Sequence, residues 1–279
     1  NVLYVIWSLG LGGAEQVVIQ LAKGLDRDRF QPFVCCLNAA GPFADELKGV
    51  GVKIFALQKK RGIDISLIGK IIRIIRENDI HLVHTHLWGA NVWGRIAGIL
   101  ASAPVVITEH NVDVWKKWHH KIIDRILANF TAKICVVSQE VKRFYTTEVG
   151  LPDRKMDVVY NGIPAESTTT DADETRRLKN EFRIHNGIPV LANVGRLVPA
   201  KANHIFIAAL KILDRENLLF HALIAGDGPL RQELTTQADP LMKENKISFT
   251  GLRKDMPAIW DITDICVLSS TREGFSMVI

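Results

Sequence analysis

The sequence predicts an α/β protein with two doubly wound parallel-sheet domains that face a cleft. Short apolar runs rich in β-branched residues recur along the chain, and segments with helical spacing separate them. Runs that are apolar at nearly every position are typical of strands covered by helices on both faces. One polar stretch after Pro164 interrupts the alternation. We therefore predict an N-terminal domain over residues 1–164 and a C-terminal domain over residues 165–279.

The N-terminal domain is predicted to begin with a strand over residues 2–7. This segment has no basic residues before its apolar run, so it does not read as a signal peptide. A turn with Gly12 and Gly13 follows, where the backbone can approach a phosphate closely. Further strands are expected at 32–37, 53–57, 80–84, 104–108, 133–138 and 156–160, and helices at 16–25, 43–50, 65–78, 91–100, 119–129 and 139–148.

Residues 165–174 are polar and are predicted to form a linker. After it the strand–helix alternation resumes. Strands are expected at 189–194, 220–225, 247–249 and 266–268, and helices at 203–217, 229–238 and 256–262. Ligands of such domains bind beyond the carboxyl ends of the parallel strands, so the candidate residues are those that follow strands.

The segment 265–279 combines a short apolar strand with Glu273, Gly274, Phe275 and Ser276. If a helix begins there, its unpaired N–H groups can bind an anion. Glu273 can accept hydrogen bonds from hydroxyl groups. A carboxylate beside backbone amides suits a sugar attached to a diphosphate.

Two cations lie between a strand and a helix in the C-terminal domain. Arg196 follows Gly195, and Lys201 stands five positions later. A guanidinium binds two oxygens at once and an ammonium adds a point charge, so the pair can flank a diphosphate. A salt-bridged surface pair is the alternative. Gly226 and Asp227 end another strand in a turn that can line a nucleoside pocket, although this is also ordinary turn chemistry.

Charge and cysteine placement limit the compartment and the partners. The net charge is +5, and the surplus lies before Pro164, which allows an anionic substrate, a lipid surface or nucleic acid as partner. The four cysteines lack metal-site spacing and lie in apolar runs, so we expect buried thiols in a reducing compartment. No apolar run is long enough to span a membrane. We expect a cytoplasmic protein, peripheral on the membrane if bound to it.

Two basic segments are candidates for lipid or acceptor contact. Trp115, Lys116, Lys117 and Trp118 combine aromatic rings with cations, and the alternative is an ordinary surface loop. The predicted helix over 65–78 has a basic polar stripe, and the alternative is a core-packed helix with a solvated face. No basic platform with interleaved aromatic residues is present, so nucleic acid is not an expected partner.

Five motifs in order resemble the retaining glycosyltransferases of family 4. They are Gly12-Gly13-Ala14-Glu15, Thr108-Glu109-His110-Asn111, Gly195-Arg196-Leu197 with Lys201, Gly226-Asp227-Gly228-Pro229, and Arg272-Glu273-Gly274-Phe275. The resemblance implies the GT-B architecture of two Rossmann-like domains. It also implies that a UDP- or GDP-sugar binds mainly to the second domain and a glycan or lipid-linked acceptor mainly to the first, with no cofactor and no metal required.

The resemblance assigns catalytic roles to His110, Glu273, Arg196 and Lys201. Arg196 and Lys201 match the pair that neutralises the donor diphosphate, and Glu273 matches the first acid of the family's E-x7-E motif, placed against the hydroxyls of the sugar. His110 matches a histidine near the 6-position of that sugar. The donor-binding set is Gly12, Gly13, Arg196, Lys201, Gly226, Asp227, Glu273, Gly274, Phe275 and Ser276.

The sequence departs from the family pattern at two places. Ala202 replaces the glycine that usually follows the lysine. The second acid of the motif would fall at position 281, beyond Ile279. We therefore expect the second domain to be incomplete and this chain to be of doubtful activity by itself.

The function predicted is transfer of a sugar with retention in the synthesis of cell-surface polysaccharide or glycolipid. A nucleotide-dependent oxidoreductase is one alternative. The second predicted strand does not end in the acid that would hold a ribose, which argues against it. A non-catalytic protein that binds sugar nucleotides is the other alternative. Hydrolysis normally needs two carboxylates across the bond, and only Glu273 is a candidate.

Overall fold

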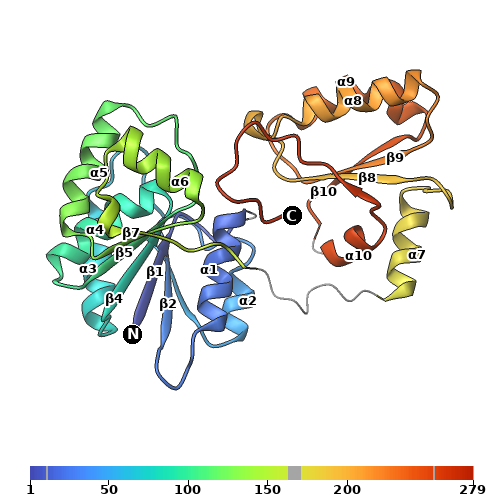
Figure 1. The fold of residues 1–279 in the computed structure, drawn as a ribbon. Coiled ribbons are helices and arrows are strands. Elements are labelled where there is room, and N and C mark those ends of the chain that lie inside the picture. The colour runs from blue at the N-terminus through green and yellow to red at the C-terminus, as the bar shows by residue number, and fades with distance from the viewer. Residues whose placement is uncertain (11, 163–170, 254, 279) are drawn as a thin grey trace. The chain divides into compact units, whose positions relative to one another are not determined.

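A computed structural model describes residues 1–10, 12–162, 171–253 and 255–278 (Figure 1). The chain forms two compact units. The first unit comprises Asn1–Gly162 together with Gly274–Met277, and the described residues from 171 to 273 belong to the second unit.

The first unit is built on a seven-stranded parallel sheet with strand order β3-β2-β1-β4-β5-β6-β7. The order reverses beside β1, which makes the carboxyl ends of β1 and β4 the topological switch point of this sheet. The strands are β1 (Val2–Ile6), β2 (Pro32–Cys36), β3 (Lys53–Ala56), β4 (Leu82–His86), β5 (Val105–Glu109), β6 (Lys133–Val136) and β7 (Met156–Val158).

Helices cover both faces of this sheet (Figure 1). Leu3 and Val5 pack into one hydrophobic core, and Tyr4 and Ile6 pack into the other, because alternate residues of a strand point to opposite faces. Helices α1 (Gly13–Gly24) and α2 (Ala44–Gly49) cover the Tyr4 face. The Leu3 face is covered by α3 (Ser66–Glu77), α4 (Trp88–Leu100), α5 (Trp118–Phe130) and α6 (Gln139–Phe144), which continues as a π-helical turn over Tyr145–Val149.

The second unit has a four-stranded parallel sheet with strand order β10-β9-β8-β11. Its strands are β8 (Val190–Val194), β9 (His221–Ala225), β10 (Ile247–Gly251) and β11 (Ile265–Cys266). Helices α8 (Asn203–Arg215) and α9 (Arg231–Lys243) pack on the face that holds Ala222 and Ile224. Helices α7 (Ala172–Glu181) and α10 (Met256–Asp261) pack on the face that holds Leu223.

The predicted fold class is confirmed, since both sheets are parallel and helices lie on both faces of each. The sequence missed helix α7. Residues 172–174 were assigned to a linker but form its first turn, because Asp171 accepts a hydrogen bond from the backbone N–H of Asp173 and Leu178 is buried. The rest of the predicted linker, residues 165–170, lies outside the described residues.

Two further predictions were wrong. The sequence allowed a helix beginning at Gly274, but residues 274–278 are not helical. The cysteines are not uniformly buried: Cys35 and Cys36 are, but Cys135 is half-buried and Cys266 is exposed, because β11 is a short edge strand.

Candidate functional site

Lys201 and Glu273 form an ion pair in the second unit. Lys201 ends a 3-10 turn over Pro199–Lys201 that follows β8, and Glu273 lies in the loop that follows β11. Ser270 Oγ donates a hydrogen bond to the same carboxylate oxygen, Oε1, at 2.6 Å. The two charged side chains are 21% and 24% exposed, so the pair is partly screened from water but open to a ligand.

The two loops that carry this pair are joined by hydrogen bonds. Ser269 Oγ donates to the carbonyl of Lys201 at 2.9 Å, and the backbone N–H of Thr271 donates to the carbonyl of Ala200 at 2.9 Å. Asn193, near the end of β8, donates to the carbonyl of Val267 at 2.8 Å. The ion pair is therefore held on a fixed backbone rather than on two independent loops.

Gly195 lies beneath the Lys201 side chain. A Cβ atom placed on Gly195 would stand 3.3 Å from Cε of Lys201. Arg196, the next residue, is exposed and forms no ion pair with any carboxylate in the described part of the chain. Lys201 and Glu273 are therefore in contact beside Gly195, the residue before Arg196. Lys201 is paired with a carboxylate, whereas Arg196 pairs with none in the described part of the chain.

The turn after β9 packs against the turn after β8. Gly226 has φ of +142°, and a Cβ atom there would lie 1.9 Å from the carbonyl oxygen of Gly195, so only glycine fits. The backbone N–H of Leu197 donates to the carbonyl of Asp227 at 2.9 Å. Asp227 itself accepts from the N–H of Gly228 at 2.7 Å. Gly226 and Asp227 therefore position the loop that bears Arg196.

His110 follows β5 in the first unit and belongs to a chain of three histidines. Its Nε2 lies 3.0 Å from Nδ1 of His86, and the His86 ring lies 4.3 Å from the ring of His84. Nε2 of His84 lies 2.8 Å from Oγ1 of Thr108. Burial lowers the pKa of His110 to about 3 and that of His84 to about 4, and it holds the pKa of His86 well below its ordinary value. All three imidazoles are therefore neutral at physiological pH.

The segment Gly274–Met277 packs within the first unit. A Cβ atom on Gly274 would lie 1.8 Å from the carbonyl oxygen of His110, so the two backbones touch. The ring of Phe275 lies 5.7 Å from that of Tyr160. A Cβ atom on Gly13 would lie 3.2 Å from Cγ of Met277, whereas one on Gly12 would collide with the Glu15 carboxylate. The structure groups Gly13, His110 and Gly274, but the amides of Gly274, Phe275 and Ser276 do not form a helix N-terminus.

Lys116 was predicted to contact an acceptor or a membrane, and the structure corrects this placement. Its side chain is buried, and its ammonium lies 2.8 Å from Oδ2 of Asp124 and donates to the hydroxyl of Tyr145 at 2.9 Å. Arg95 pairs with the other Asp124 oxygen. Burial raises the pKa of Glu109, and the charge of Lys116 opposes this shift. The carboxylates of Asp124, Glu109 and Asp113 lie within 3.7 Å of this ammonium and compensate its charge.

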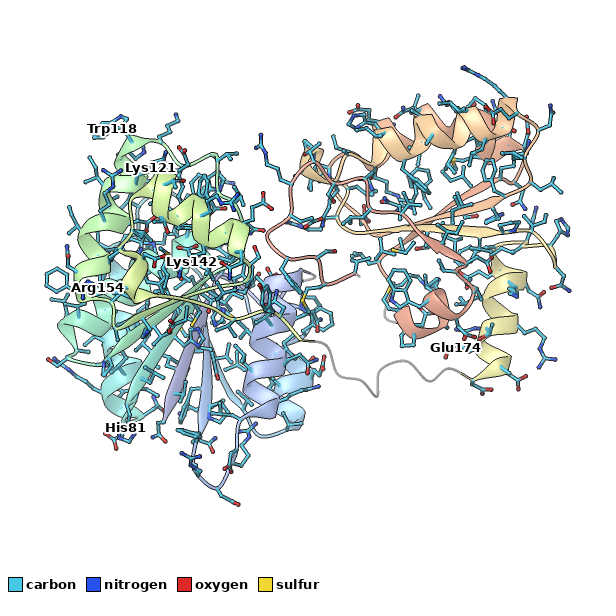
Figure 2. The ribbon with its side chains drawn as sticks, viewed as in Figure 1. His81, Trp118, Lys121, Lys142, Arg154 and Glu174 are labelled. Atoms are coloured by element: carbon cyan, nitrogen blue, oxygen red, sulfur yellow. The ribbon has the colours of Figure 1, made fainter. Side chains whose placement is uncertain are left out.

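The other residues of that segment are at the surface. Trp115 is 51% exposed and Trp118 is 72% exposed, and Lys117 is also exposed. Trp115 is in an aromatic cluster, with ring centroids 5.6 Å from Trp88 and 5.2 Å from His120. Figure 2 shows Trp118 at the surface of the first unit.

The helix predicted over 65–78 packs as an ordinary core helix. As α3 it buries Leu67, Ile71, Ile74 and Ile75, and its exposed face carries Arg73 and Arg76. Its exposed apolar surface is confined to the N-terminal end, where the N-cap residue Ile65 is 70% exposed. In the described residues, no helix is both long and apolar enough to cross a bilayer.

The described residues contain no group of three or more His, Cys, Asp and Glu side chains arranged to hold a metal ion. The two aspartates at the start of α7 have structural roles instead. Asp171 caps α7, and Asp173 pairs with Arg176.

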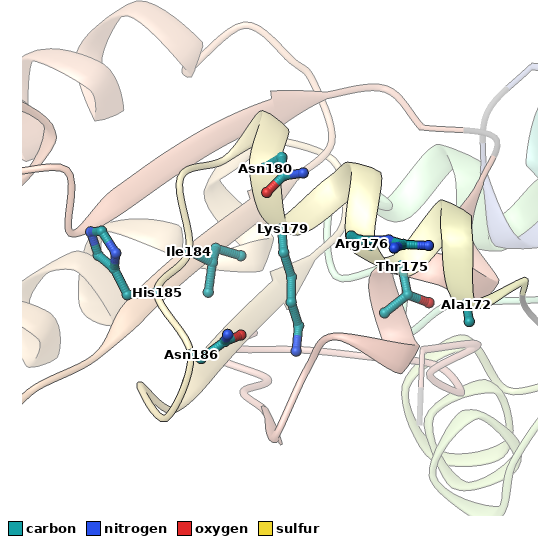
Figure 3. Close-up of a pocket in the computed structure, with 8 residues that line it drawn as sticks. All are labelled: Ala172, Thr175, Arg176, Lys179, Asn180, Ile184, His185 and Asn186. Carbon is teal, nitrogen blue, oxygen red and sulfur yellow. The ribbon is translucent and has the colours of Figure 1, made fainter.

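A hollow of about 520 Å³ lies beside α7 (Figure 3). None of the predicted site residues lines it. Its lining is Ala172, Thr175, Arg176, Lys179, Asn180, Ile184, His185 and Asn186.

Sequence reasoning missed three residues that the structure places at these sites. Ser270 supports Glu273, His86 contacts His110, and Tyr145 joins the network of Lys116. Ser270 follows the predicted strand by two positions, which is a detectable signal. His86 lies on β4 and His110 follows β5, 24 positions later, so no local pattern connects them.

Comparisons with known proteins match both units. A family model described as Glycosyltransferase Family 4 matches residues 11–167, and one described as Glycosyl transferases group 1 matches residues 174–279. The chain is 27% identical to the UDP-Gal:alpha-D-GlcNAc-diphosphoundecaprenol alpha-1,3-galactosyltransferase of Escherichia coli, over 96% of this chain and 73% of that protein.

Solved structures give the same result. The crystal structure of Anabaena HepE in complex with UDP matches with a TM-score of 0.81 and 26% identity, covering 100% of this chain and 77% of HepE. The HepE structure with UDP-glucose matches with a TM-score of 0.83 and 25% identity, covering 97% and 74%.

Proposed function

The chain belongs to glycosyltransferase family 4, and from this premise we propose that it transfers a hexose from a uridine diphosphate sugar to a lipid-linked glycan with retention of configuration. Its architecture is GT-B, with two parallel-sheet α/β units. A uridine donor is proposed because HepE binds UDP and UDP-glucose and the E. coli relative uses UDP-Gal. The lipid-linked acceptor, and a role at an anionic membrane in polysaccharide or glycolipid synthesis, are proposed from the diphosphoundecaprenol substrate of that relative.

The observation that carries this proposal is the partly exposed pair of Lys201 and Glu273 next to the exposed Arg196, which pairs with no carboxylate among the described residues. A nucleoside diphosphate leaves readily once its developing charge is stabilised by fixed cations. Arg196 and Lys201 supply those cations. Glu273, which Ser270 holds in place, is suited to accept hydrogen bonds from hydroxyls of the sugar. Removing one such charge-stabilising group typically costs about 3–4 kcal/mol in the barrier.

His110 is proposed to act as a neutral hydrogen-bonding group near the transferred sugar. Its lowered pKa leaves it uncharged, so it is not a source of positive charge for the diphosphate. We propose that the departing diphosphate oxygen takes the proton of the acceptor hydroxyl on the same face of the sugar, which gives retention. No metal or cofactor is part of this proposal.

The experiment is a thermal-shift panel of UDP, UDP-glucose, UDP-galactose, UDP-N-acetylglucosamine and GDP-mannose. A ligand present at about a hundred times its Kd stabilises the folded state by about 2.7 kcal/mol. We expect one uridine donor to raise the Tm of the wild type and of Arg215→Ala, an exposed cation on α8 that serves as control. Arg196→Ala and Lys201→Ala are expected to abolish the shift. A shift that survives both substitutions contradicts the assigned diphosphate site.

A further inference from the structure

Helix α5 exposes its largest apolar side chains. Trp118 is 72% exposed, Ile122 42%, Ile126 55% and Phe130 62%. These four residues recur at intervals of four, so they form one continuous strip along the helix surface, here termed the α5 ridge. The inner side of the same helix buries the charged Asp124 with Leu127 and Ala128. This is the reverse of the usual pattern for a helix on a soluble protein.

Buried polar contacts prevent the helix from rotating to hide the ridge. Asp124 is fixed by Arg95 on α4 and by Lys116 just before α5. At the other end, Nζ of Lys155 donates to the carbonyls of Ala128, Asn129 and Thr131 at 2.8 to 2.9 Å. Rotating the helix would separate Asp124 from both cations, and an uncompensated buried charge is strongly destabilising. The outward orientation of the ridge is therefore built into the fold.

The charges around the ridge indicate what covers it. All 13 residues of α5 are described, and Asp124, its one acidic residue, is buried. Lys117, Lys121 and Arg125 lie in a row along one side of the ridge. Lys121 is 3.7 Å from Glu148, and Nε of Arg125 donates to the carbonyl of Val149. Figure 2 shows Trp118 and Lys121 on the outer side of this unit. Tryptophan beside cations at one end of an apolar strip is a combination suited to the interface of an anionic bilayer.

We propose that the α5 ridge inserts into the headgroup region of an anionic membrane, with Lys117, Lys121 and Arg125 contacting lipid phosphates. The choice of a bilayer over a protein partner rests on the proposed function, in which the acceptor is lipid-linked. A ridge of this kind holds the first unit at the surface where such an acceptor lies.

The test is flotation of the full chain with vesicles of phosphatidylcholine, with or without phosphatidylglycerol. The variant is Ile122→Glu with Ile126→Glu. The matched control is Ile205→Glu with Ile212→Glu, two isoleucines on α8 that are 50% and 53% exposed. We expect wild type and control to float with anionic vesicles and the ridge variant to bind about tenfold more weakly. A second variant, Lys117→Gln with Arg125→Gln, should lose binding in about 0.1 M salt and resemble wild type in about 1 M salt, where screening is nearly complete.

Equal flotation of the ridge variant and wild type overturns the proposal, as does a wild type that binds neither vesicle. A wild type that is dimeric, with a monomeric ridge variant, also overturns it, because the ridge would then be covered by a second copy of this chain. Retained helical content and Tm show that each variant is folded. The thermal shift by the donor separates the two proposals, since it reports on Arg196 and Lys201 whether or not the protein binds lipid.

Discussion

The ammonium of Lys201 bonds to Oε1 of Glu273 in the structure. At the proposed diphosphate site, this carboxylate would compete with the diphosphate for Lys201. Glu273→Gln keeps the size and hydrogen-bonding capacity of the side chain but removes its charge. We expect this change to lower the Kd for UDP by up to about tenfold, since a charge-assisted bond of about 1.4 kcal/mol no longer has to be replaced.

The same variant should transfer sugar more slowly, because an amide holds the hydroxyls of the sugar less strongly than a carboxylate does. Calorimetric titration of UDP measures the first effect, and turnover of the preferred donor measures the second. Glu233→Gln, an exposed acid on α9, is the control. Weaker UDP binding by Glu273→Gln would show that the carboxylate supports the diphosphate site rather than competing with it.

His84 makes the first unit sensitive to acid. Its pKa falls from 6.5 to about 4 on burial. Between these values the unfolded chain binds a proton at this histidine and the folded chain does not, so stability is lost as pH falls from about 6.5 to about 4. Each pH unit in this window costs about 1.4 kcal/mol.

His84→Gln should remove the part of this sensitivity that His84 contributes, while His86 and His110 keep theirs, and it keeps a hydrogen bond to Thr108. Denaturant titrations at several pH values should give a shallower loss of unfolding free energy in acid for His84→Gln than for wild type. His204→Gln, an exposed histidine on α8, should follow wild type. Parallel curves for His84→Gln and wild type would mean that His84 is protonated in the folded protein.

At the scale of elements, one lysine closes the C-terminal end of α5. The last carbonyls of a helix have no hydrogen-bond donor within it. Here the ammonium of Lys155 donates to three carbonyls in and just beyond the last turn. Lys155→Met should lower the unfolding free energy by about 1–3 kcal/mol.

Denaturant unfolding measures this loss. Lys133→Met is the matched control, because its ion pair with Asp157 is 50% and 57% exposed and contributes less than about 1 kcal/mol. Equal effects of the two substitutions would show that the carbonyls near the end of α5 do not depend on Lys155.

Which elements the sequence could predict depended on local signals. The strands were found because each is a short apolar run. In the structure neighbouring strands pair in parallel. Helix α7 was missed because it buries only Leu178 and is otherwise polar. Lys116 was misplaced because a basic and aromatic segment looks exposed. Its partners Asp124 and Tyr145 lie 8 and 29 positions away, and only folding brings them together.

For the whole molecule, the two units have separate hydrophobic cores and should unfold separately. Lys116→Met leaves buried carboxylates without their partner, which costs about 3–5 kcal/mol in the first unit. Gly226→Ala places a methyl group 1.9 Å from the carbonyl oxygen of Gly195 and strains the second unit.

Scanning calorimetry should resolve two transitions, with one lowered by Lys116→Met and the other by Gly226→Ala. Tyr4→Phe provides a mild control within the first unit, since it keeps the ring that packs beside His84. A single transition that both substitutions lower equally would show that the units unfold as one.

The sequence predicted which residues belong to the candidate site, but not which of them are in contact. Five motifs named Arg196, Lys201, Glu273 and His110, because each follows a strand and carries a side chain suited to a sugar diphosphate. The pairing of Lys201 with Glu273 and the contact of His86 with His110 were not predictable, since each joins residues from different strand ends.

Lys201 and Glu273 are separated by 72 positions in the chain. During synthesis the lysine leaves the ribosome long before its carboxylate, and a nascent chain that has reached only β10 carries the cation alone. Closing a loop of this length is slow and entropically costly compared with forming a local turn. The complete charge arrangement therefore appears only after β11 has joined the sheet, so the proposed sugar-diphosphate site is assembled late in folding.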